Sequence, residues 1–374
     1  MRKAFTITVQ DHSGAARTGR IRTPHGAIET PAFAPVASQG TVKALLHDRV
    51  KKLGADLILV NAYHLYLRPG LETIAECGGI HEFISWRGPI LSDSGGFQIY
   101  SLTPLVKVTQ EGVRFSSHLD GTKIFLRPED VVDIQRSLGT DIMMVLDYFL
   151  PFPSTKTRMK DAVKMTTLWA RRSKERFLEK PSRQQLWGIS QGSVFWELRR
   201  QSIEDLLAIG FDGYALGGLG IGEPKVELMA TLEKADSLIP RDSPRYLMGM
   251  GYIEDILEAV DRGIDLFDCV LPTRNARNGT LFSSRGRLVI KNQKYARDRR
   301  PIEEGCACYT CRHFSRAYLR HLYEREEISS AVLNTIHNLH FYLDIFGKIR
   351  QSIALKSYRE FKRQLLNQLK ESEP

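Results

Sequence analysis

Three cysteines lie within six residues in the last quarter of the sequence, and their side chains offer the chemistry of metal binding. The run Cys306-Ala307-Cys308-Tyr309-Thr310-Cys311 has the pattern Cys-x-Cys-x-x-Cys. Thiolates favour zinc, and a tetrahedral zinc site takes four ligands. The cluster therefore predicts one bound Zn²⁺ that needs a fourth ligand from elsewhere in the chain.

Histidine is the expected fourth ligand, and we choose His337, which follows Cys311 by 26 residues. His313 follows the cluster too closely to bend back easily, whereas His321 and His340 are open on spacing alone. Four protein ligands leave no open coordination position, so we expect a structural zinc and not a catalytic one. The alternative is a set of three buried free thiols.

The elements that must position other chemistry are eight short apolar runs with helix-like segments between several of them. The runs cover residues 32–36, 57–61, 90–93, 142–147, 187–191, 214–218, 246–249 and 264–268. The helical segments cover residues 42–53, 127–138, 162–178, 196–209, 226–238 and 253–262. Alternating strands and helices in a chain of this length favour an α/β fold of the (β/α)8 TIM-barrel type. An open doubly wound sheet is the alternative.

Polar residues or glycine end five of these predicted strands: Asp93, Asp147, Gln191, Gly218 and Asp268. In a TIM barrel the carboxyl ends of all strands meet on one face, and the active site forms there. We therefore expect these five residues to line one site.

The predicted organisation is a catalytic barrel over residues 1–287 and a zinc-binding subdomain over residues 288–374. A hairpin is expected as an insertion near residues 94–126, where alternating residues surround Val113 and Phe115. The C-terminal part is expected to pack its helices on the barrel and to end in an amphipathic helix near residues 358–369.

Composition limits the setting and the partner. The 374 residues are 42% hydrophobic and 26% charged, with a formal net charge of +10 that favours a polyanionic partner. The longest apolar runs, such as residues 57–60, are far shorter than the roughly 20 residues that cross a bilayer, and the N-terminus lacks the apolar core of a signal peptide. Five cysteines, an odd number, suit metal binding in a reducing compartment. We expect a cytoplasmic protein without membrane contact.

Six motifs occur in a recognisable order. They are Ser92-Asp93-Ser94-Gly95-Gly96-Phe97-Gln98, Gly188-Ile189-Ser190-Gln191-Gly192-Ser193, Gly217-Gly218-Leu219, Tyr246-Leu247-Met248-Gly249, Phe267-Asp268-Cys269-Val270-Leu271-Pro272-Thr273-Arg274 and the cysteine cluster. Together they closely resemble the tRNA-guanine transglycosylases, the queuine tRNA-ribosyltransferase family, in its bacterial form. The resemblance runs from Thr30-Pro31-Ala32-Phe33 to His337-Asn338.

The resemblance implies a zinc-bearing barrel that exchanges the wobble guanine, position 34, of G-U-N anticodon tRNAs (Asp, Asn, His, Tyr) for a 7-deazaguanine in queuosine modification. By position, Asp268 is the expected nucleophile and Asp93 the expected general acid and base. Replacing a base at C1′ of ribose passes through an oxocarbenium-like state, and two carboxylates can serve the two halves of a double displacement. Two inversions give net retention.

The resemblance also implies a base pocket. The N1 and N2 donors of guanine call for a carboxylate acceptor, by position Asp147, and O6 calls for donors, which Gln191 and the Gly218 NH can supply. Phe97 and Met248 can cover the two faces of the ring, although both are equally expected as core residues. The complete substrate-binding set is Ser94, Phe97, Asp147, Gln191, Gly218, Leu219 and Met248.

Two departures from the family pattern bear on the incoming base. The sequence reads Asp147-Tyr148-Phe149 where the bacterial enzymes have Asp-Glu-Cys, and Gly220 stands where alanine is expected. These positions, with Ile221, are expected to line the region that admits the substituent at C7. Both 7-aminomethyl-7-deazaguanine and queuine are therefore open as the incoming base.

Anticodon contacts are expected in two segments that follow strands, where arginines can bind phosphates or unstacked bases. The expected RNA-binding residues are Gly249, Met250, Gly251, Tyr252, Ile253, Glu254, Asp255, Thr273, Arg274, Asn275, Ala276 and Arg277. The family's bacterial members pair as homodimers, and the resemblance implies the same here.

Three alternatives compete with this interpretation. A non-catalytic partner subunit that binds tRNA is disfavoured because Asp93, Asp147, Gln191 and Asp268 are all retained. Archaeal relatives that act on the D-loop carry further C-terminal RNA-binding domains, and only 37 residues follow His337 here. A metal-dependent hydrolase on the same barrel would need several histidines near the strand ends.

Overall fold

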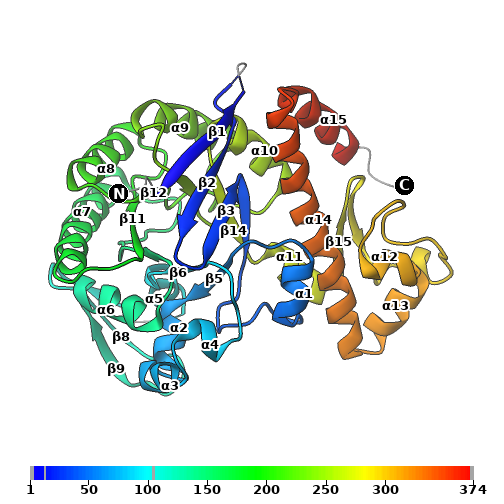
Figure 1. Cartoon of the computed structure of the whole chain (residues 1–374), viewed down its shortest axis with the longest axis horizontal. Coiled ribbons are helices and arrows are strands. Elements are labelled where there is room, and N and C mark those ends of the chain that lie inside the picture. Colours follow the sequence, from blue (N-terminus) through cyan, green and yellow to red (C-terminus); the bar gives the residue numbers. More distant parts are fainter. Residues whose placement is uncertain (1–3, 12–13, 103–105, 371–374) are drawn as a thin grey trace.

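Eight parallel strands form the centre of the molecule in the computed structural model (Figure 1). The structure describes residues 4–11, 14–102 and 106–370. Apart from the pairing of the last parallel strand with the first, neighbours along the sheet are consecutive parallel strands in the sequence. A parallel bridge between Val36 and Leu59 joins the first strand to the second and closes the sheet, so the predicted TIM barrel is confirmed. The strands are β4 (Ala32–Pro35), β5 (Ile58–Asn61), β6 (Ile90–Asp93), β10 (Ile142–Met144), β11 (Gln185–Ser190), β12 (Gly213–Leu216), β13 (Arg245–Leu247) and β14 (Leu266–Cys269).

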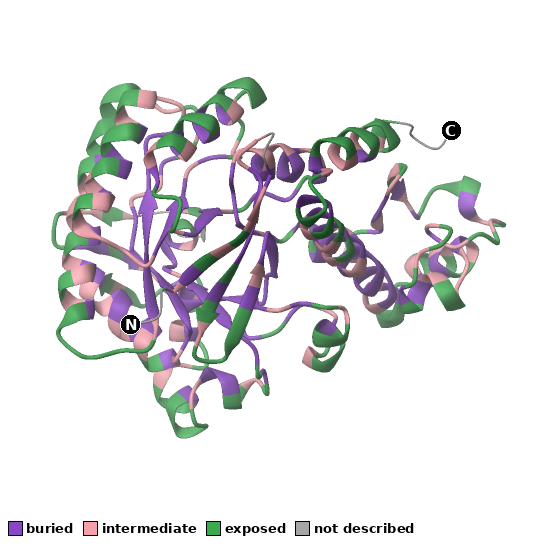
Figure 2. Cartoon of the chain, turned by 45° about the horizontal axis from the view of Figure 1, so that its top comes forward, coloured by how far each residue is buried: buried purple, intermediate pink, exposed green. Residues whose placement is uncertain are grey.

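Helices surround the barrel with their apolar sides inward, and Figure 2 shows exposed residues on their outer sides. They are α1 (His47–Lys52), α2 (Ala62–Leu67), α3 (Leu71–Glu76), α4 (Ile80–Phe83), α5 (Gly96–Leu102), α6 (Pro128–Leu138), α7 (Lys156–Leu178), α8 (Trp196–Ile209), α9 (Lys225–Leu238) and α10 (Ile253–Asp261). Helix α6 shows the local signals: Pro128 occupies its first turn, Asp130 accepts from the Arg127 backbone NH, and Gly139 ends it at a φ of 78°.

The insertion predicted near residues 94–126 begins with helix α5 and not with a strand. A three-stranded antiparallel sheet follows, formed by β7 (Lys107–Val108), β8 (Val113–Ser116) and β9 (Lys123–Leu126). Val113 and Phe115 of β8 are both buried, as the alternating pattern predicted. Gly95, at a φ of 81°, turns the chain from β6 into α5, which is why the segment directly after Asp93 is helical.

An antiparallel sheet of three strands, which the sequence analysis did not predict, covers the amino-terminal end of the barrel. It consists of β1 (Phe5–Gln10), β2 (Arg17–Thr23) and β3 (Gly26–Thr30). Arg17 lies buried against Asp265, the residue before β14, with 2.6 Å between Nη2 and Oδ2. The same oxygen accepts the Arg245 backbone NH at 2.8 Å, so the buried carboxylate fixes β2 to the start of two barrel strands.

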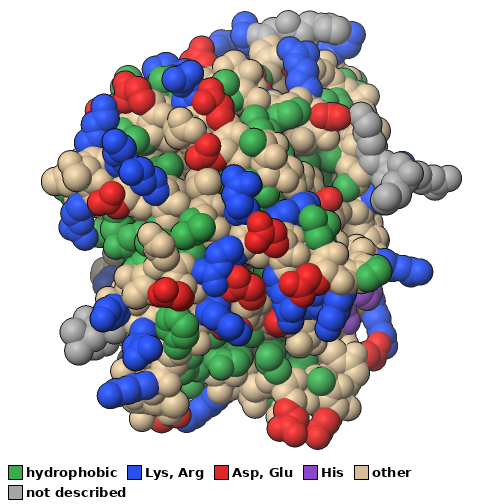
Figure 3. All heavy atoms as spheres, turned by 90° about the vertical axis from the view of Figure 1, so that its left-hand side faces the viewer, with side chains coloured by type: hydrophobic (Ala, Val, Ile, Leu, Met, Phe, Trp, Pro, Cys, Tyr) green, Lys and Arg blue, Asp and Glu red, His purple; other side chains and the backbone are tan. Residues whose placement is uncertain are grey.

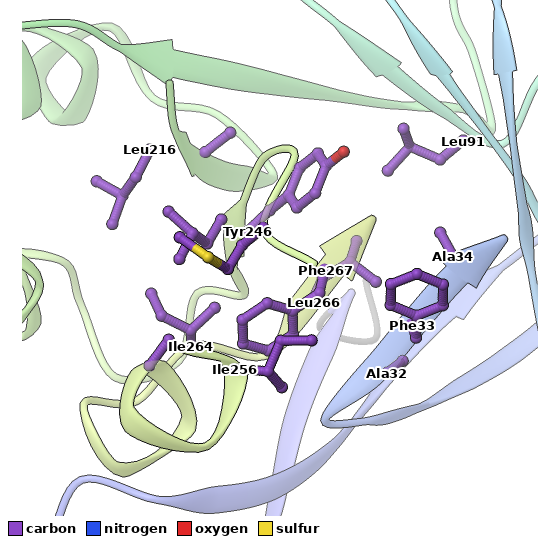
Figure 4. Close-up of a cluster of buried hydrophobic side chains, with 14 of the residues drawn as sticks. Ala32, Phe33, Ala34, Leu91, Leu216, Tyr246, Ile256, Ile264, Leu266 and Phe267 are labelled. Atoms are coloured by element: carbon purple, nitrogen blue, oxygen red, sulfur yellow. The ribbon is translucent and has the colours of Figure 1, made fainter. Parts of the chain in front are cut away.

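The long helix α14 (Ile328–Ala354) lies between the barrel and the C-terminal elements (Figure 1). Its Phe346 ring lies 5.8 Å from that of Phe33 on β4 and 5.7 Å from that of Phe267 on β14. Figure 4 shows Phe33 and Phe267 together in this part of the core. Helix α14 thus covers the strand pair β14–β4, the place that the eighth helix takes in a TIM barrel.

Most of the remaining elements form a smaller core beside α14. They are β15 (Thr280–Ser283), β16 (Gly286–Val289), a 3₁₀ turn (Gln293–Tyr295), α12 (Tyr309–His313) and α13 (Arg316–Glu324). The last helix, α15 (Tyr358–Lys370), packs instead on the main core through Tyr358 and Leu365. Leu281, Leu288, Ile302 and Leu319 belong to the smaller core. Strand β15 contributes Leu281 to this smaller core, and α14 contributes side chains both to it and to the main core. The division of the chain at residue 287 therefore stays a prediction.

The outer surface over α7 and α8 carries Lys and Arg interspersed with Asp and Glu (Figure 3). Two ion pairs on α7 join it to α6: Arg172 to Glu129 at 2.7 Å and Arg176 to Asp133 at 2.8 Å. In the parts of the chain that the structure describes, no helix combines the length and apolar character of a membrane-spanning segment.

Candidate active site and metal centre

A cavity of about 360 Å³ opens at the carboxyl ends of the barrel strands. Asp93, Asp147, Gly218 and Asp268 line it, as expected from their places at the strand ends. Gln191 lies directly behind the lining: it is buried and its Nε2 donates to Asp147 Oδ2 at 2.7 Å. The structure therefore brings all five predicted strand-end residues together in one place.

Asp93, the last residue of β6, is held by two side-chain amides. Its Oδ2 accepts from Asn61 Nδ2 at 2.6 Å and from Gln98 Nε2 at 3.2 Å. Burial, and then the nearby charge of Asp268, raise the pKa of Asp93 to about 8, although the Asn61 hydrogen bond opposes the shift. This carboxyl group is therefore largely protonated at neutral pH.

Asp268 stands near the end of β14 and receives two hydrogen bonds on a single oxygen. The Tyr246 hydroxyl donates to Oδ1 at 2.6 Å and the Gly249 backbone NH donates to it at 2.8 Å. Burial raises the pKa of Asp268, and these two hydrogen bonds oppose that shift. Both donors favour the carboxylate form, and they leave Oδ2 for other interactions.

The carboxyl groups of Asp93 and Asp268 differ in which of them holds a proton, as acid–base chemistry requires. The charge of Asp268 is among the causes that raise the pKa of Asp93, so the two groups titrate as a coupled pair. A pair of this kind keeps one proton near neutral pH, with the proton on the more strongly shifted group. The cavity thus offers a protonated acid at Asp93 and a carboxylate at Asp268.

Asp147 is a third carboxyl group in the cavity. Burial raises its pKa to about 6, against hydrogen bonds from Gln191 and Ser94. Gln191 uses Nε2 for this carboxylate, while its Oε1 is buried without a hydrogen-bond partner among the described residues. One amide proton of Nε2 is thus already engaged, a constraint on the donor role predicted for Gln191.

Two glycines allow the backbone to approach these groups closely. A Cβ at Gly96 would lie 2.6 Å from Asp147 Oδ1, and a Cβ at Gly218 would lie 2.5 Å from Gln191 Oε1. Gly218 also has a φ of 63°, which side-chain-bearing residues rarely adopt. Any larger residue at either position would displace the polar groups of the cavity.

The apolar walls of the cavity include Phe97, Met248 and Leu219, as expected. Phe97 is 51% exposed and packs edge-on against Phe149 with ring centroids 5.1 Å apart, so it is not a core residue. Met248 is partly buried against the main core.

The residues that depart from the family pattern divide into two groups. Phe149, Gly220 and Ile221 line the cavity, as expected. Tyr148 instead stacks on Tyr100 with ring centroids 5.4 Å apart and is not part of the lining. The expectation that Tyr148 lines the cavity is therefore wrong, because alternate residues of the extended segment after β10 point to opposite sides.

The two segments expected to contact RNA border the cavity at Gly249 and Arg274. The second is helix α11 (Leu271–Arg277). Exposed or partly exposed members are Gly249, Tyr252, Glu254, Arg274, Asn275 and Arg277. Buried members are Met250, Gly251, Ile253, Asp255, Thr273 and Ala276; Asp255 is ion-paired with Lys225 at 2.7 Å.

Cys306, Cys308, Cys311 and His337 form one group whose ligand atoms all lie within 4.8 Å of one another. His337 Nδ1 lies 3.9, 3.6 and 3.3 Å from the three Sγ atoms in that order. Tetrahedral zinc bonds of about 2.3 Å to sulfur and 2.05 Å to nitrogen imply S···N separations of roughly 3.5 Å. The donor set and spacing fit a tetrahedral metal ion.

A hydrogen bond on the side of the ring away from the cysteines also fixes His337, because its Nε2 lies 2.7 Å from the Phe282 carbonyl oxygen and can donate to it. This bond leaves Nδ1 as the ligand atom. Of the alternative histidines, His340 has its Nδ1 3.7 Å from Cys306 Sγ. Among the described residues, His313, His321 and His340 all lie outside the group of four ligand atoms.

Sequence reasoning missed the groups that orient the two acids. Asn61 ends a predicted strand, so the rule that selected Asp93 would also have selected it. Its Oδ1 accepts the His64 backbone NH at the start of α2 while its Nδ2 holds Asp93. Tyr246 and Gln98 lie inside the motifs of the sequence analysis, yet no spacing indicated that they hold Asp268 and Asp93.

Comparisons with known proteins agree with this geometry. A family model described as queuine tRNA-ribosyltransferase matches residues 11–371. The chain is 54% identical over 362 residues to the queuine tRNA-ribosyltransferase of Thermodesulfovibrio yellowstonii, covering 97% of this chain and 94% of that protein. It is 50% identical over 378 residues to the protein of the same name from Aquifex aeolicus, covering 98% of each chain.

Proposed function

The chain belongs to the queuine tRNA-ribosyltransferase family, a family of pentosyltransferases, and we propose how its cavity exchanges a base in tRNA. The substrate is guanine at the wobble position 34 of G-U-N anticodons, and a 7-deazaguanine replaces it in queuosine modification. The observation that carries the proposal is the pair Asp93 and Asp268: two partly buried carboxyl groups with raised pKa values line one cavity from two barrel strands.

In the first half of the reaction, Asp268 Oδ2 attacks C1′ of the ribose. The C1′–O bond forms as the C1′–N9 bond breaks, and guanine takes both electrons of the broken bond together with a proton from Asp93. The Tyr246 hydroxyl and the Gly249 NH hold the attacking carboxylate by its other oxygen. Asp93 starts protonated because of its pKa of about 8, so it can act as the acid at neutral pH.

In the second half, Asp93 is a carboxylate and accepts the proton of the incoming base. That base attacks C1′ from the face that guanine left, and the C1′–O bond to Asp268 breaks. Each step inverts C1′, so the new nucleotide keeps the β configuration. Forming the covalent intermediate consumes no nucleoside triphosphate, because the energy of the broken glycosidic bond is retained in the C1′–O ester bond to Asp268.

Asp147 is proposed to accept from N1 and N2 of the base, and the Gly218 NH and the free proton of Gln191 Nε2 to donate to O6. Phe97 and Met248 cover its two faces, with Ser94 and Leu219 at the edges of the same cavity. Phe149, Gly220 and Ile221 face the substituent at C7. Exchange of 7-aminomethyl-7-deazaguanine and of queuine into one tRNA, measured side by side, identifies the incoming base.

Direct anticodon contacts are proposed for the exposed and partly exposed side chains Tyr252, Glu254, Arg274, Asn275 and Arg277. Arg274 has the best position, because it is exposed and also lines the cavity that receives position 34. The buried members of the two segments would act by shaping the backbone. The tRNA set and homodimer assembly stay predictions, as does the cytoplasmic location.

One Zn²⁺ is proposed at Cys306, Cys308, Cys311 and His337, with His340 excluded from the set. Because all four positions are filled by protein atoms, the ion would hold the start of α12 on α14 and would take no part in the reaction. A metal assay on purified protein should give one zinc per chain, and less than half an equivalent would overturn this assignment.

The decisive experiment for the reaction is Asp268→Asn. The variant should fold and bind metal as the original protein does, because only the attacking oxygen changes, yet it should trap no covalent tRNA adduct on a denaturing gel. The matched control is Asp161→Asn, at an exposed position on α7, which should trap adduct normally. An adduct formed by Asp268→Asn would remove Asp268 as the nucleophile.

A further inference from the structure

A second group of metal-ligating side chains lies at the opposite end of the barrel from the cavity. It consists of His25, in the turn between β2 and β3, His81 on α4, and Asp141, the residue before β10. Asp141 accepts the backbone NH of Ile90, the first residue of β6, whereas Asp93 is the last residue of the same strand. Three residues of extended chain, about 10 Å, therefore separate the two ends.

The three side chains converge closely. His25 Nδ1 lies 2.8 Å from Asp141 Oδ1, and His81 Nε2 lies 3.2 Å from Oδ2. The two imidazole rings stack with centroids 3.6 Å apart and an angle of 20° between their planes. Two rings that face one carboxylate side by side bring one nitrogen of each to the same small volume.

Backbone groups hold Asp141 in position in addition to the two imidazole rings. The Ile90 NH donates to Oδ2 at 2.8 Å and the His25 NH donates to Oδ1 at 3.2 Å, so backbone groups anchor both oxygens. The carboxylate is fully buried, and although burial opposes ionisation, hydrogen bonds from His81, Ile90 and His25 keep its pKa below the usual value. An anchored, ionised carboxylate between two imidazoles is a suitable donor set for a cation.

We propose that His25, His81 and Asp141 form a second metal site, which binds a divalent transition-metal ion. Metal bonds of about 2.1 Å at right angles place neighbouring ligand atoms roughly 3 Å apart, close to the 2.8 and 3.2 Å N···O separations here. Two imidazoles favour transition metals over Mg²⁺ or Ca²⁺. The ion approaches past His25, whose side chain is 41% exposed, and water completes its coordination.

Binding requires each ring to present an unprotonated nitrogen to the ion. A neutral ring does so by moving its proton to its other nitrogen, and a charged ring does so by releasing a proton to solvent. A bound ion would join the N-terminal sheet, α4 and the start of β10, so its effect is on stability and not on base exchange.

The test uses untagged full-length protein with its cysteine site already filled by zinc, titrated with Co²⁺. The expected result is one further equivalent per chain and a raised Tm. Nitrogen and oxygen ligands give weak d–d bands without the thiolate charge-transfer absorption that cobalt in the cysteine site would show. The spectrum therefore tells the two sites apart.

His25→Ala changes a half-exposed turn residue and should fold normally, yet it should weaken Co²⁺ binding at least tenfold. His81→Gln, which keeps a hydrogen-bonding group for Asp141, should do the same. His321→Ala, at an exposed histidine on α13, is the matched control and should leave the affinity unchanged. The proposal fails if no further equivalent binds, if His25→Ala binds as tightly as the original protein, or if the bound cobalt shows thiolate absorption. Each of those outcomes would leave His25, His81 and Asp141 as a hydrogen-bonded cluster.

Discussion

Asp93→Asn should make the folded protein more stable as the pH rises, relative to the original protein, while it abolishes base exchange. The original carboxyl group keeps its proton in the folded chain up to a pKa of about 8, against an ordinary value of 3.8. Between these values the folded protein holds a proton that the unfolded chain has lost. The free energy of unfolding therefore falls by about 1.4 kcal/mol for each pH unit of increase, until the pH reaches the folded pKa.

The stability that the neutral carboxyl contributes is thus fully present below about pH 4 and is lost as the pH approaches about 8. Asparagine carries no such proton, so its advantage over aspartate should grow by about 2.7 kcal/mol from about pH 5.5 to about pH 7.5. Other titrating groups are common to both proteins and largely cancel in the difference. Urea unfolding of both proteins at each pH measures the difference directly.

Asp120→Asn is the control for this series. Asp120 is exposed and its hydrogen bonds with Thr122 and Ser117 lower its pKa, so it is ionised in both folded and unfolded chains throughout this range. Its difference from the original protein should be flat. If the Asp93→Asn difference is flat as well, Asp93 is ionised in the folded protein at neutral pH and cannot serve as the acid that protonates the leaving guanine.

Two further substitutions test the geometry of the cavity. Gly96→Ala places a methyl carbon 2.6 Å from Asp147 Oδ1, so the KM for the base should rise at least about tenfold with an unchanged circular dichroism spectrum. Gly347→Ala, whose Cβ meets nothing within 4 Å, should leave the KM unchanged, and equal values for the two variants would contradict the base-binding role. Tyr246→Phe removes a hydrogen bond that lowers the pKa of Asp268, so the acidic limb of the single-turnover rate should move up by about one pH unit. A limb that stays in place, or moves to lower pH, would show that Asp268 does not control it.

The barrel was predictable because its strands are buried on both faces and therefore read as continuous apolar runs. The residues at their carboxyl ends followed from the same pattern, and the structure brings Asp93 and Asp268 to one cavity. The N-terminal sheet was missed because β2 and β3 carry outward charges such as Arg20 and Glu29, which interrupt any apolar run. A strand with one face in solvent gives a weaker signal than a strand inside the barrel.

Side-chain direction and pairing were not predictable from the sequence. Tyr148 is adjacent to two cavity residues in sequence, yet the extended backbone turns it toward Tyr100. Asn61 and Asp93 are separated by 32 residues, and only the parallel pairing of β5 with β6 places them opposite each other. Such contacts depend on strand register, which a single sequence leaves undetermined.

Helix α14 carries the zinc-ligand candidate His337 and also supplies Phe346 to the strand pair β14–β4. During synthesis on the ribosome, residues 32–35 of β4 are therefore made about 300 residues before the helix that covers them. The pair of β4 and β14 therefore lacks this cover until α14 has been synthesised. The metal ion proposed at His337 would hold this same helix, so its binding would also favour closure of the barrel.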